Sequence, residues 1–128
     1  LKGCTVDASA IPDLVPTISA LAACAEGETR VTNAGRLRFK ESDRLKTTSD
    51  MLTALGADIE EKRDGLVIHG KTYLDGGMVD AANDHRIAMA AAVAACMCKN
   101  DVIVTGAECV DKSYPDFWKH LEALEVLP

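Results

Sequence analysis

Three short cationic segments stand at or just before predicted helix starts, where they could hold an anion. They are Lys40-Glu41-Ser42-Asp43-Arg44, Asp84-His85-Arg86 and Asp111-Lys112-Ser113. A cation in the first turn of a helix faces the positive end of the helix dipole, which is unfavourable. Three such placements favour a bound anion that compensates them, held jointly by Arg and Lys side chains and by helix N-termini.

The local charge supports an anion site in the first of these segments. Residues 36–46 carry five cations against Glu41 and Asp43, a sum of +3 in a chain whose net charge is −6. The alternative is that Glu41 with Arg44, and Asp84 with Arg86, form exposed ion pairs, which contribute little to stability. Sequence alone leaves both interpretations open.

Other polar and aromatic residues have ordinary structural interpretations. Asp13 is a plausible N-cap, with Pro16 in the first turn of the following helix. His85 could be a helix-terminal histidine, and it is not assigned as a base. Three aromatic side chains are expected in the core, because their spacing fits a helix packed on a sheet: Tyr114, Phe117 and Trp118.

The five cysteines are expected to be reduced thiols in a cytosolic compartment, since their number is odd. Cys24, Cys96 and Cys98 lie in alanine-rich stretches that predict buried helix. A metal site at Cys96-x-Cys98 is disfavoured because this spacing is unusual for zinc, and neither a His nor a second Cys pair follows at ligand spacing. No metal ligands are therefore assigned.

The elements that must position these residues form a mixed pattern, β-α-β-α-β-β. A strand at Thr5–Ala8 precedes a helix that ends near Gly27, and a strand at Thr29–Ala34 precedes a helix from Ser42 to Gly56. Asp64-Gly65 predicts a hairpin between Asp58–Arg63 and Leu66–His69. The pattern indicates an α/β or α+β fold.

The second half of the chain repeats this order without the hairpin. Its predicted elements are a strand at Met78–Ala81, a helix from Asn83 or Asp84 to Ala95, a strand at Val102–Thr105 and a helix at Tyr114–Leu124. Ala22-Ala23-Cys24 recurs 72 positions later as Ala94-Ala95-Cys96, and Lys40 as Lys112. Residues 1–72 and 73–128 are therefore predicted to be two repeat units of one partial domain.

The composition restricts the function classes. With 128 residues, 48% of them hydrophobic and 27% charged, the chain can form a packed core. The net charge of −6 argues against binding nucleic acid or a membrane surface through a broad cationic face. No apolar run is long enough to span a bilayer, and no signal-peptide pattern is present. The expected core includes Ile18, Leu21, Leu52, Leu55, Val93, Leu121 and Leu124.

Four motifs resemble the 5-enolpyruvylshikimate-3-phosphate synthase family. They are Ile11-Pro12-Asp13, the segment 36–44 that ends in Lys-Glu-Ser-Asp-Arg, the segment 83–90 that begins Asn-Asp-His-Arg, and Lys112-Ser113-Tyr114-Pro115-Asp116-Phe117. The resemblance covers nearly the whole chain and about the last third of the family's sequence. It implies two globular domains, each built from three β-α-β-α-β-β units, with the active site between them. This chain would then hold about two units of one domain.

The resemblance also implies an activity. Members of the family transfer the enolpyruvyl group of phosphoenolpyruvate to the 5-hydroxyl of shikimate 3-phosphate and release phosphate, in the cytoplasmic synthesis of chorismate and aromatic amino acids. They use no metal and no organic cofactor. The family has a relative that acts on UDP-N-acetylglucosamine, and the Lys-Glu-Ser-Asp-Arg and Asp-His-Arg-Ile-Ala-Met segments are unlike that relative.

The resemblance further implies roles for single residues. Asp13 would accept or orient the proton of the 5-hydroxyl, Lys40 would contact the shikimate phosphate and shuttle a proton, and Glu41 would protonate the methylene carbon of phosphoenolpyruvate. Three cations would hold the phosphoenolpyruvate carboxylate and phosphate: Arg44, Arg86 and Lys112. Arg36 stands where some members have a substrate-contacting asparagine, so it receives no role.

The family's amino-terminal lysine, Gly-rich segment and serine-rich phosphate site have no counterpart in this sequence. The chain is therefore expected to be a carboxy-terminal fragment that needs the remainder of the enzyme for activity. Two alternatives remain open at this point. One is a related enolpyruvyl transferase with another acceptor, and the other is a non-catalytic anion-binding module of the same fold.

Overall fold

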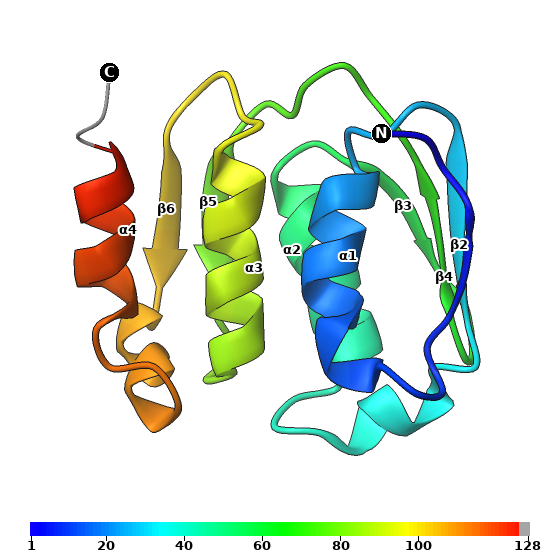
Figure 1. The fold of residues 1–128 in the computed structure, drawn as a ribbon, viewed down its shortest axis with the longest axis horizontal. Coiled ribbons are helices and arrows are strands. Elements are labelled where there is room, and N and C mark those ends of the chain that lie inside the picture. Colours follow the sequence, from blue (N-terminus) through cyan, green and yellow to red (C-terminus); the bar gives the residue numbers. More distant parts are fainter. Residues whose placement is uncertain (126–128) are drawn as a thin grey trace.

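The computed structural model describes residues 1–125, which form two β-sheets and a set of helices packed beside them (Figure 1). The larger sheet has four strands in the order β1-β2-β4-β3. β1 and β2 are parallel, and the pairs β2/β4 and β3/β4 are antiparallel. Its strands are β1 (Thr5–Asp7), β2 (Glu28–Thr32), β3 (Asp58–Glu61) and β4 (Leu66–His69).

The helices of this first part connect its parallel strands and lead into its hairpin. The α-helices are α1 (Val15–Ala22) and α2 (Arg44–Ala54), and two 3₁₀ helices precede them, η1 (Pro12–Leu14) and η2 (Gly35–Phe39). The hairpin β3–β4 is present as predicted, but its connection is the four residues 62–65 and not the two-residue turn that Asp64-Gly65 predicted. The strands and helices otherwise start or end within a few residues of their predicted bounds.

The second part contains a separate two-stranded parallel sheet. Its elements are β5 (Gly77–Asp80), α3 (His85–Ala95), β6 (Val102–Thr105), the 3₁₀ helix η3 (Ala107–Lys112) and α4 (Phe117–Glu125). β6 has the predicted bounds. α4 was expected to begin at Tyr114, but it begins after Pro115, at Phe117.

The two parts share details of local structure. The Thr32 hydroxyl donates to the Val6 carbonyl at 3.4 Å, and 73 positions later the Thr105 hydroxyl donates to the Val79 carbonyl at 3.3 Å. Each bond joins the two parallel strands of its own sheet. The recurrence supports a duplicated β-α-β unit, while the unit boundaries 1–72 and 73–128 stay a prediction.

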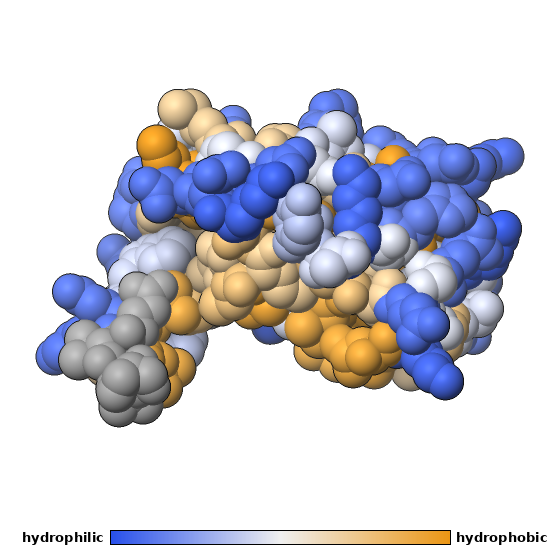
Figure 2. Space-filling view, turned by 90° about the horizontal axis from the view of Figure 1, so that it is seen from above, coloured by the Kyte–Doolittle hydropathy of each residue, from blue (hydrophilic) through white to orange (hydrophobic). Residues whose placement is uncertain are grey.

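The core lies between the larger sheet and the helices α1, α2 and α3. Leu52 and Leu55 are buried as expected, whereas Ile18, Val93 and Leu121 are only partly buried. The expectation was wrong for Leu21, which is 40% exposed, and for Leu124, which is 66% exposed. Both side chains lie on helices but outside the core. Figure 2, seen from the end where α1 and α3 finish, shows hydrophobic surface gathered along one side of the molecule.

Two predicted N-caps have different outcomes. Asp13 does not cap α1, because it lies in η1 and α1 starts after Leu14 without a side-chain cap bond. Asp84 is the cap of α3, and its carboxylate accepts the backbone N–H of Arg86. The second helix was expected to start at Ser42, but it starts at Arg44 with Asp43 as its cap.

The cysteine and aromatic expectations are only partly met. Cys24 and Cys98 are partly buried and Cys109 is buried, but Cys96 is exposed because it follows the last turn of α3. Phe117 and Trp118 pack on a small cluster beside α3, whereas Tyr114 is largely exposed and was wrongly placed in the core. Within residues 1–125, no helix combines the length and apolar character needed to cross a membrane.

Candidate active site

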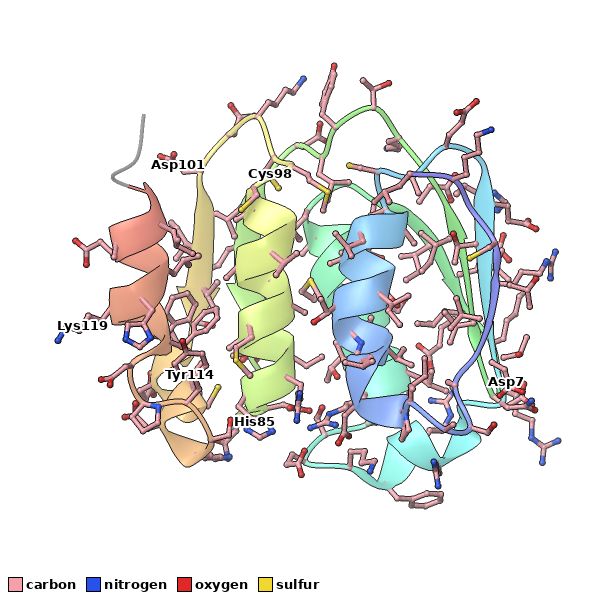
Figure 3. All side chains as sticks on the ribbon, in the orientation of Figure 1. Asp7, His85, Cys98, Asp101, Tyr114 and Lys119 are labelled. Atoms are coloured by element: carbon pink, nitrogen blue, oxygen red, sulfur yellow. The ribbon has the colours of Figure 1, made fainter. Side chains whose placement is uncertain are left out.

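The candidate residues gather at one end of the molecule, where α1, α2 and α3 all begin (Figure 1). Figure 3 shows His85 at this end of α3 and Cys98 at the opposite end. The cap Asp84 and the first residues of α3 face the segment between η2 and α2. Three helix N-termini at one place provide a locally positive backbone field, which favours anionic groups.

Arg44 is the centre of this cluster. It belongs to the first turn of α2, and its side chain is 1% exposed. Its guanidinium donates to both carboxylate oxygens of Asp84, at 2.8 and 3.1 Å, and to Asp13 at 3.0 Å. It also donates to Glu41. One cation therefore holds three carboxylates that come from three different parts of the chain.

Asp84 is the fully buried partner of Arg44. Burial by itself raises the pKa of Asp84, but hydrogen bonds from Arg44 and Ser42 outweigh burial, so that the pKa lies below its ordinary value. Burial likewise acts to lower the pKa of Arg44, and the bonds and charges of its carboxylate partners raise it overall. The pair is therefore ionised in the folded protein.

These contacts contradict the exposed ion pair expected between Asp84 and Arg86, whereas Glu41 does pair with Arg44, although the Arg44 side chain is buried. Asp84 pairs with the Arg44 side chain inside the protein, and Arg86 contributes its backbone N–H to Asp84 at 3.0 Å. The Arg86 side chain points instead toward Asp13, at 4.0 Å between Nη2 and Oδ2. Breaking a buried pair of this kind is costly because it leaves one uncompensated charge.

Asp13 is the most accessible carboxylate of the cluster, with half of its side chain exposed. Besides Arg44, Lys40 approaches it with 3.7 Å between Nζ and Oδ1. Arg86 is 38% exposed and approaches it from α3. Asp13 thus faces solvent among three cations, where a positioned carboxylate can accept a proton.

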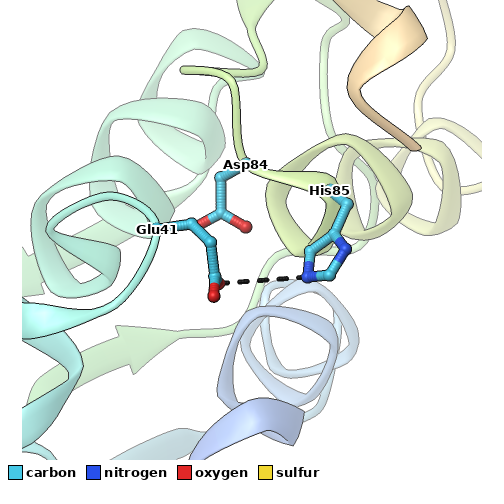
Figure 4. Close-up of side chains that lie close together, drawn as sticks. All are labelled: Glu41, Asp84 and His85. Carbon is cyan, nitrogen blue, oxygen red and sulfur yellow. Dashed lines mark ion pairs between the residues drawn. The ribbon is translucent and has the colours of Figure 1, made fainter. Parts of the chain in front are cut away.

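Glu41 lies between Arg44 and His85 (Figure 4). His85 Nε2 is 3.9 Å from Glu41 Oε2, and among the described residues the buried Nδ1 of His85 has no hydrogen-bond partner. Oxygen and nitrogen atoms of Glu41, Asp84 and His85 lie within 4.8 Å of one another. Arg44 already neutralises these carboxylates and would repel a metal ion, so the cluster does not fit a metal site.

Lys112 and Arg36 adjoin the cluster without entering it. Lys112, at the end of η3, donates from Nζ to the Asn83 carbonyl at 2.6 Å, just before the cap of α3. Arg36 donates to the Ser9 carbonyl, beside the loop that leads to Asp13. The structure therefore brings Asp13, Lys40, Glu41, Arg44 and Arg86 into one network and places Lys112 beside it. Their roles toward a substrate stay predictions.

Sequence reasoning missed two contributors. It assigned Asp84 as a cap but not as the buried partner of Arg44. It also gave no role to Arg38, whose side chain donates to Asp43 and Glu61. The signal for Asp84 was a carboxylate at a predicted helix start in an apolar surrounding, where an ion needs a partner.

Comparison with known proteins gives a consistent result. The model of the family described as EPSP synthase (3-phosphoshikimate 1-carboxyvinyltransferase) matches residues 1–121. The chain belongs to the EPSP synthase family. A 3-phosphoshikimate 1-carboxyvinyltransferase of Clostridium acetobutylicum is 54% identical over 122 residues, which are 95% of this chain and 28% of that relative. One of Clostridioides difficile is 48% identical over 125 residues, 97% of this chain and 29% of that relative.

Solved structures agree with the fold. An EPSP synthase from Acinetobacter baumannii has a TM-score of 0.89 and 34% identity, over 97% of this chain and 30% of that one. The enolpyruvyl transferase NikO from Streptomyces tendae has a TM-score of 0.78 at 22% identity, over 98% of this chain and 28% of that one, and it supports the fold alone. The chain spans a little under a third of these EPSP synthases.

Proposed function

We propose that this chain forms part of an enzyme that transfers the enolpyruvyl group of phosphoenolpyruvate to the 5-hydroxyl of shikimate 3-phosphate and releases phosphate. The observation that carries the proposal is the exposed carboxylate of Asp13 among Lys40, Arg44 and Arg86 at a shared helix end. Membership of the EPSP synthase family supports the choice of substrates. We place the enzyme in the cytoplasm, in the synthesis of aromatic amino acids.

The accessible carboxylate fits the first half of the reaction. An alcohol must lose its proton as it attacks the enolpyruvyl carbon, and a positioned carboxylate can accept this proton. Lys40 lies 3.7 Å from Asp13, so its ammonium can contact the phosphate-bearing acceptor and move a proton.

Glu41 fits the complementary role. The methylene carbon of phosphoenolpyruvate must gain a proton as the tetrahedral adduct forms, and a carboxyl group that has first taken up a proton can donate it. Glu41 is nearly half exposed and its carboxylate adjoins His85 and Arg44. In the elimination, the methyl carbon of the adduct returns a proton to Glu41 while the C–O bond to phosphate breaks. The proton taken from the 5-hydroxyl leaves with the phosphate, and the 5-oxygen stays bonded to the enolpyruvyl carbon.

The cations fit the multiply anionic substrates. Arg86 and Lys112 are exposed enough to meet the carboxylate and phosphate of phosphoenolpyruvate. Arg44 is already saturated by protein carboxylates, so a substrate carboxylate would have to replace Asp13 or Glu41 on its guanidinium. Fixed cations at the place where negative charge develops stabilise the transition state.

The remainder of the parent enzyme is the proposed partner of this chain, since complete relatives are more than three times as long. We propose no cofactor and no metal. The test is a phosphate-release assay on the full-length protein that contains this sequence, with both substrates together and with each alone. UDP-N-acetylglucosamine in place of shikimate 3-phosphate tests the related acceptor class.

A matched pair of variants sharpens the test. Asp13→Asn removes the proposed base, whereas Asp50→Asn removes an exposed carboxylate of α2 that pairs with Lys46 outside the cluster. Phosphate release that needs both substrates and is lost in Asp13→Asn but not in Asp50→Asn supports the proposal. Release that occurs only with UDP-N-acetylglucosamine, or that survives Asp13→Asn, contradicts it.

A further inference from the structure

The segment 39–42 carries Lys40 and Glu41 and, after Phe39 at the end of η2, has no regular secondary structure. It connects the end of η2 to the cap of α2. Its backbone is weakly tied, with the Lys40 N–H donating to the Leu37 carbonyl at 3.4 Å. A loop that carries reacting groups must nevertheless be held in place, because small displacements of such groups lower the rate steeply.

One side chain holds both ends of this segment. Arg38 immediately precedes the segment, and its Nη1 donates to both oxygens of Asp43, at 2.9 and 3.2 Å, immediately after it. The same nitrogen donates to Glu61 at 2.9 Å. Nη2 donates to the Lys62 carbonyl at 2.8 Å, and Nε donates to the Arg63 carbonyl at 3.0 Å.

These bonds join η2, the cap of α2 and the β3–β4 hairpin. Arg38 belongs to η2, and Asp43 caps α2 by accepting the Lys46 N–H at 3.2 Å. Glu61 is the last residue of β3, and residues 62 and 63 begin the turn of the β3–β4 hairpin. The hydrogen bonds to Glu61 and Asp43 raise the pKa of Arg38. The planar guanidinium is suited to several fixed partners at once, which an ammonium cannot match.

Arg38 is not positioned to bind substrate. Two carboxylates and two carbonyls take up its donors, and its charge is matched by Asp43 and Glu61. It therefore differs from Lys40 and Arg86, although all three contribute to the same cationic end of the molecule.

We propose that Arg38 is a positioning residue, which fixes the segment 39–42 so that Lys40 and Glu41 face Asp13 and Arg44. The inference rests on the proposed enolpyruvyl transfer. Arg38 makes no contact with substrate in this proposal, and it affects the reaction through the positions of Glu41 and Lys40.

The experiment compares Arg38→Gln, Arg38→Lys and Arg63→Gln in the full-length protein. Arg63 is the matched control, because it is an exposed arginine of the same turn that contributes only its backbone carbonyl. We expect Arg38→Gln to lower kcat by about 10- to 100-fold, with KM for both substrates changed by less than about threefold. Arg38→Lys should recover part of this loss, and Arg63→Gln should retain the wild-type kcat.

A double variant identifies the route of the effect. If Arg38 acts through Glu41, Arg38→Gln combined with Glu41→Gln should be little slower than Glu41→Gln alone. Fully multiplicative losses would overturn the proposal, as would a wild-type kcat in Arg38→Gln or a loss confined to KM. If Arg38→Gln does not fold, Arg38→Lys decides by the same criteria for kcat and KM.

Amide hydrogen exchange, which does not depend on enzymatic turnover, tests this inference separately from the proposed function. In Arg38→Gln, the amides of Lys46 and Thr47, which bond to Asp43, should exchange with solvent faster than in the wild type. The proposed function fails if the wild-type protein shows no enolpyruvyl transfer. The positioning role of Arg38 fails if the Lys46 and Thr47 amides exchange in Arg38→Gln at the wild-type rate.

Discussion

Replacing Asp84 by Asn isolates the buried charge on which the cluster depends. The amide oxygen can still cap α3, since Asn is as good a cap as Asp, but the amide has no second oxygen to accept the Ser42 hydroxyl. It cannot neutralise Arg44, and its NH₂ group would face the guanidinium if its oxygen kept the cap bond. The variant therefore tests the ion pair with little change in side-chain volume.

The expected loss of folding stability in Asp84→Asn follows from the burial of the ion pair. Removing one partner of a buried ion pair costs about 3–5 kcal/mol. Because Arg44 keeps Asp13 and Glu41, we expect a value near the lower end, about 3 kcal/mol. At this chain length 1 kcal/mol corresponds to roughly 4 °C in Tm, so the melting temperature should fall by about 12 °C.

The assay is thermal and urea unfolding of the 128-residue chain followed by circular dichroism, at several pH values. The pKa of Asp84 is lowered in the folded state, so its stabilisation is present above its unfolded pKa and is lost as the pH falls toward the lower folded value. The difference in stability between wild type and Asp84→Asn should therefore shrink below about pH 4.

Asp50→Asn is the control, since it removes an exposed helical ion pair with Lys46 and should leave the melting temperature near that of the wild type. A loss below about 1 kcal/mol in Asp84→Asn, or a loss that does not change with pH, would refute the reasoning that this pair is ionised and carries stability.

Three further predictions concern activity. In the full-length protein, Asp13→Asn and Glu41→Gln should each lower kcat by about 100-fold or more, measured by steady-state phosphate release, and near-normal turnover in either would disprove its proton-transfer role. Arg86→Ala should weaken phosphoenolpyruvate binding by at least about tenfold in titration calorimetry while shikimate 3-phosphate binds as before; equal losses would mean a structural role. The isolated chain should show a cooperative unfolding transition yet release no phosphate from the two substrates, because a partial site forgoes about 7–11 kcal/mol of positioning. Turnover comparable to that of a complete enzyme would contradict the need for the rest of the protein.

The sequence by itself determined the features that depend on neighbouring residues. Asp64-Gly65 predicted a hairpin at this place because both residue types favour turns, although the connection is four residues long and not two. The local sequence of Val102–Thr105 predicted β6, and a carboxylate before an alanine-rich stretch predicted the cap of α3. The motifs that resemble EPSP synthase also lie in short contiguous segments, so they could be recognised without coordinates.

Only the tertiary structure decided which charges pair. Asp84 lies 40 positions from Arg44 and Asp13 lies 31 positions from it, and no local pattern specifies contacts at such separations. Asp13 was therefore expected to cap a helix. The sequence also did not decide whether Arg44 forms its ion pairs at the surface or in the interior. The exposure of Leu21 has the same origin, because a helix pattern shows that a face is apolar but not which element covers it. Burial makes an ion pair strong or costly, and burial is a property of the assembled fold.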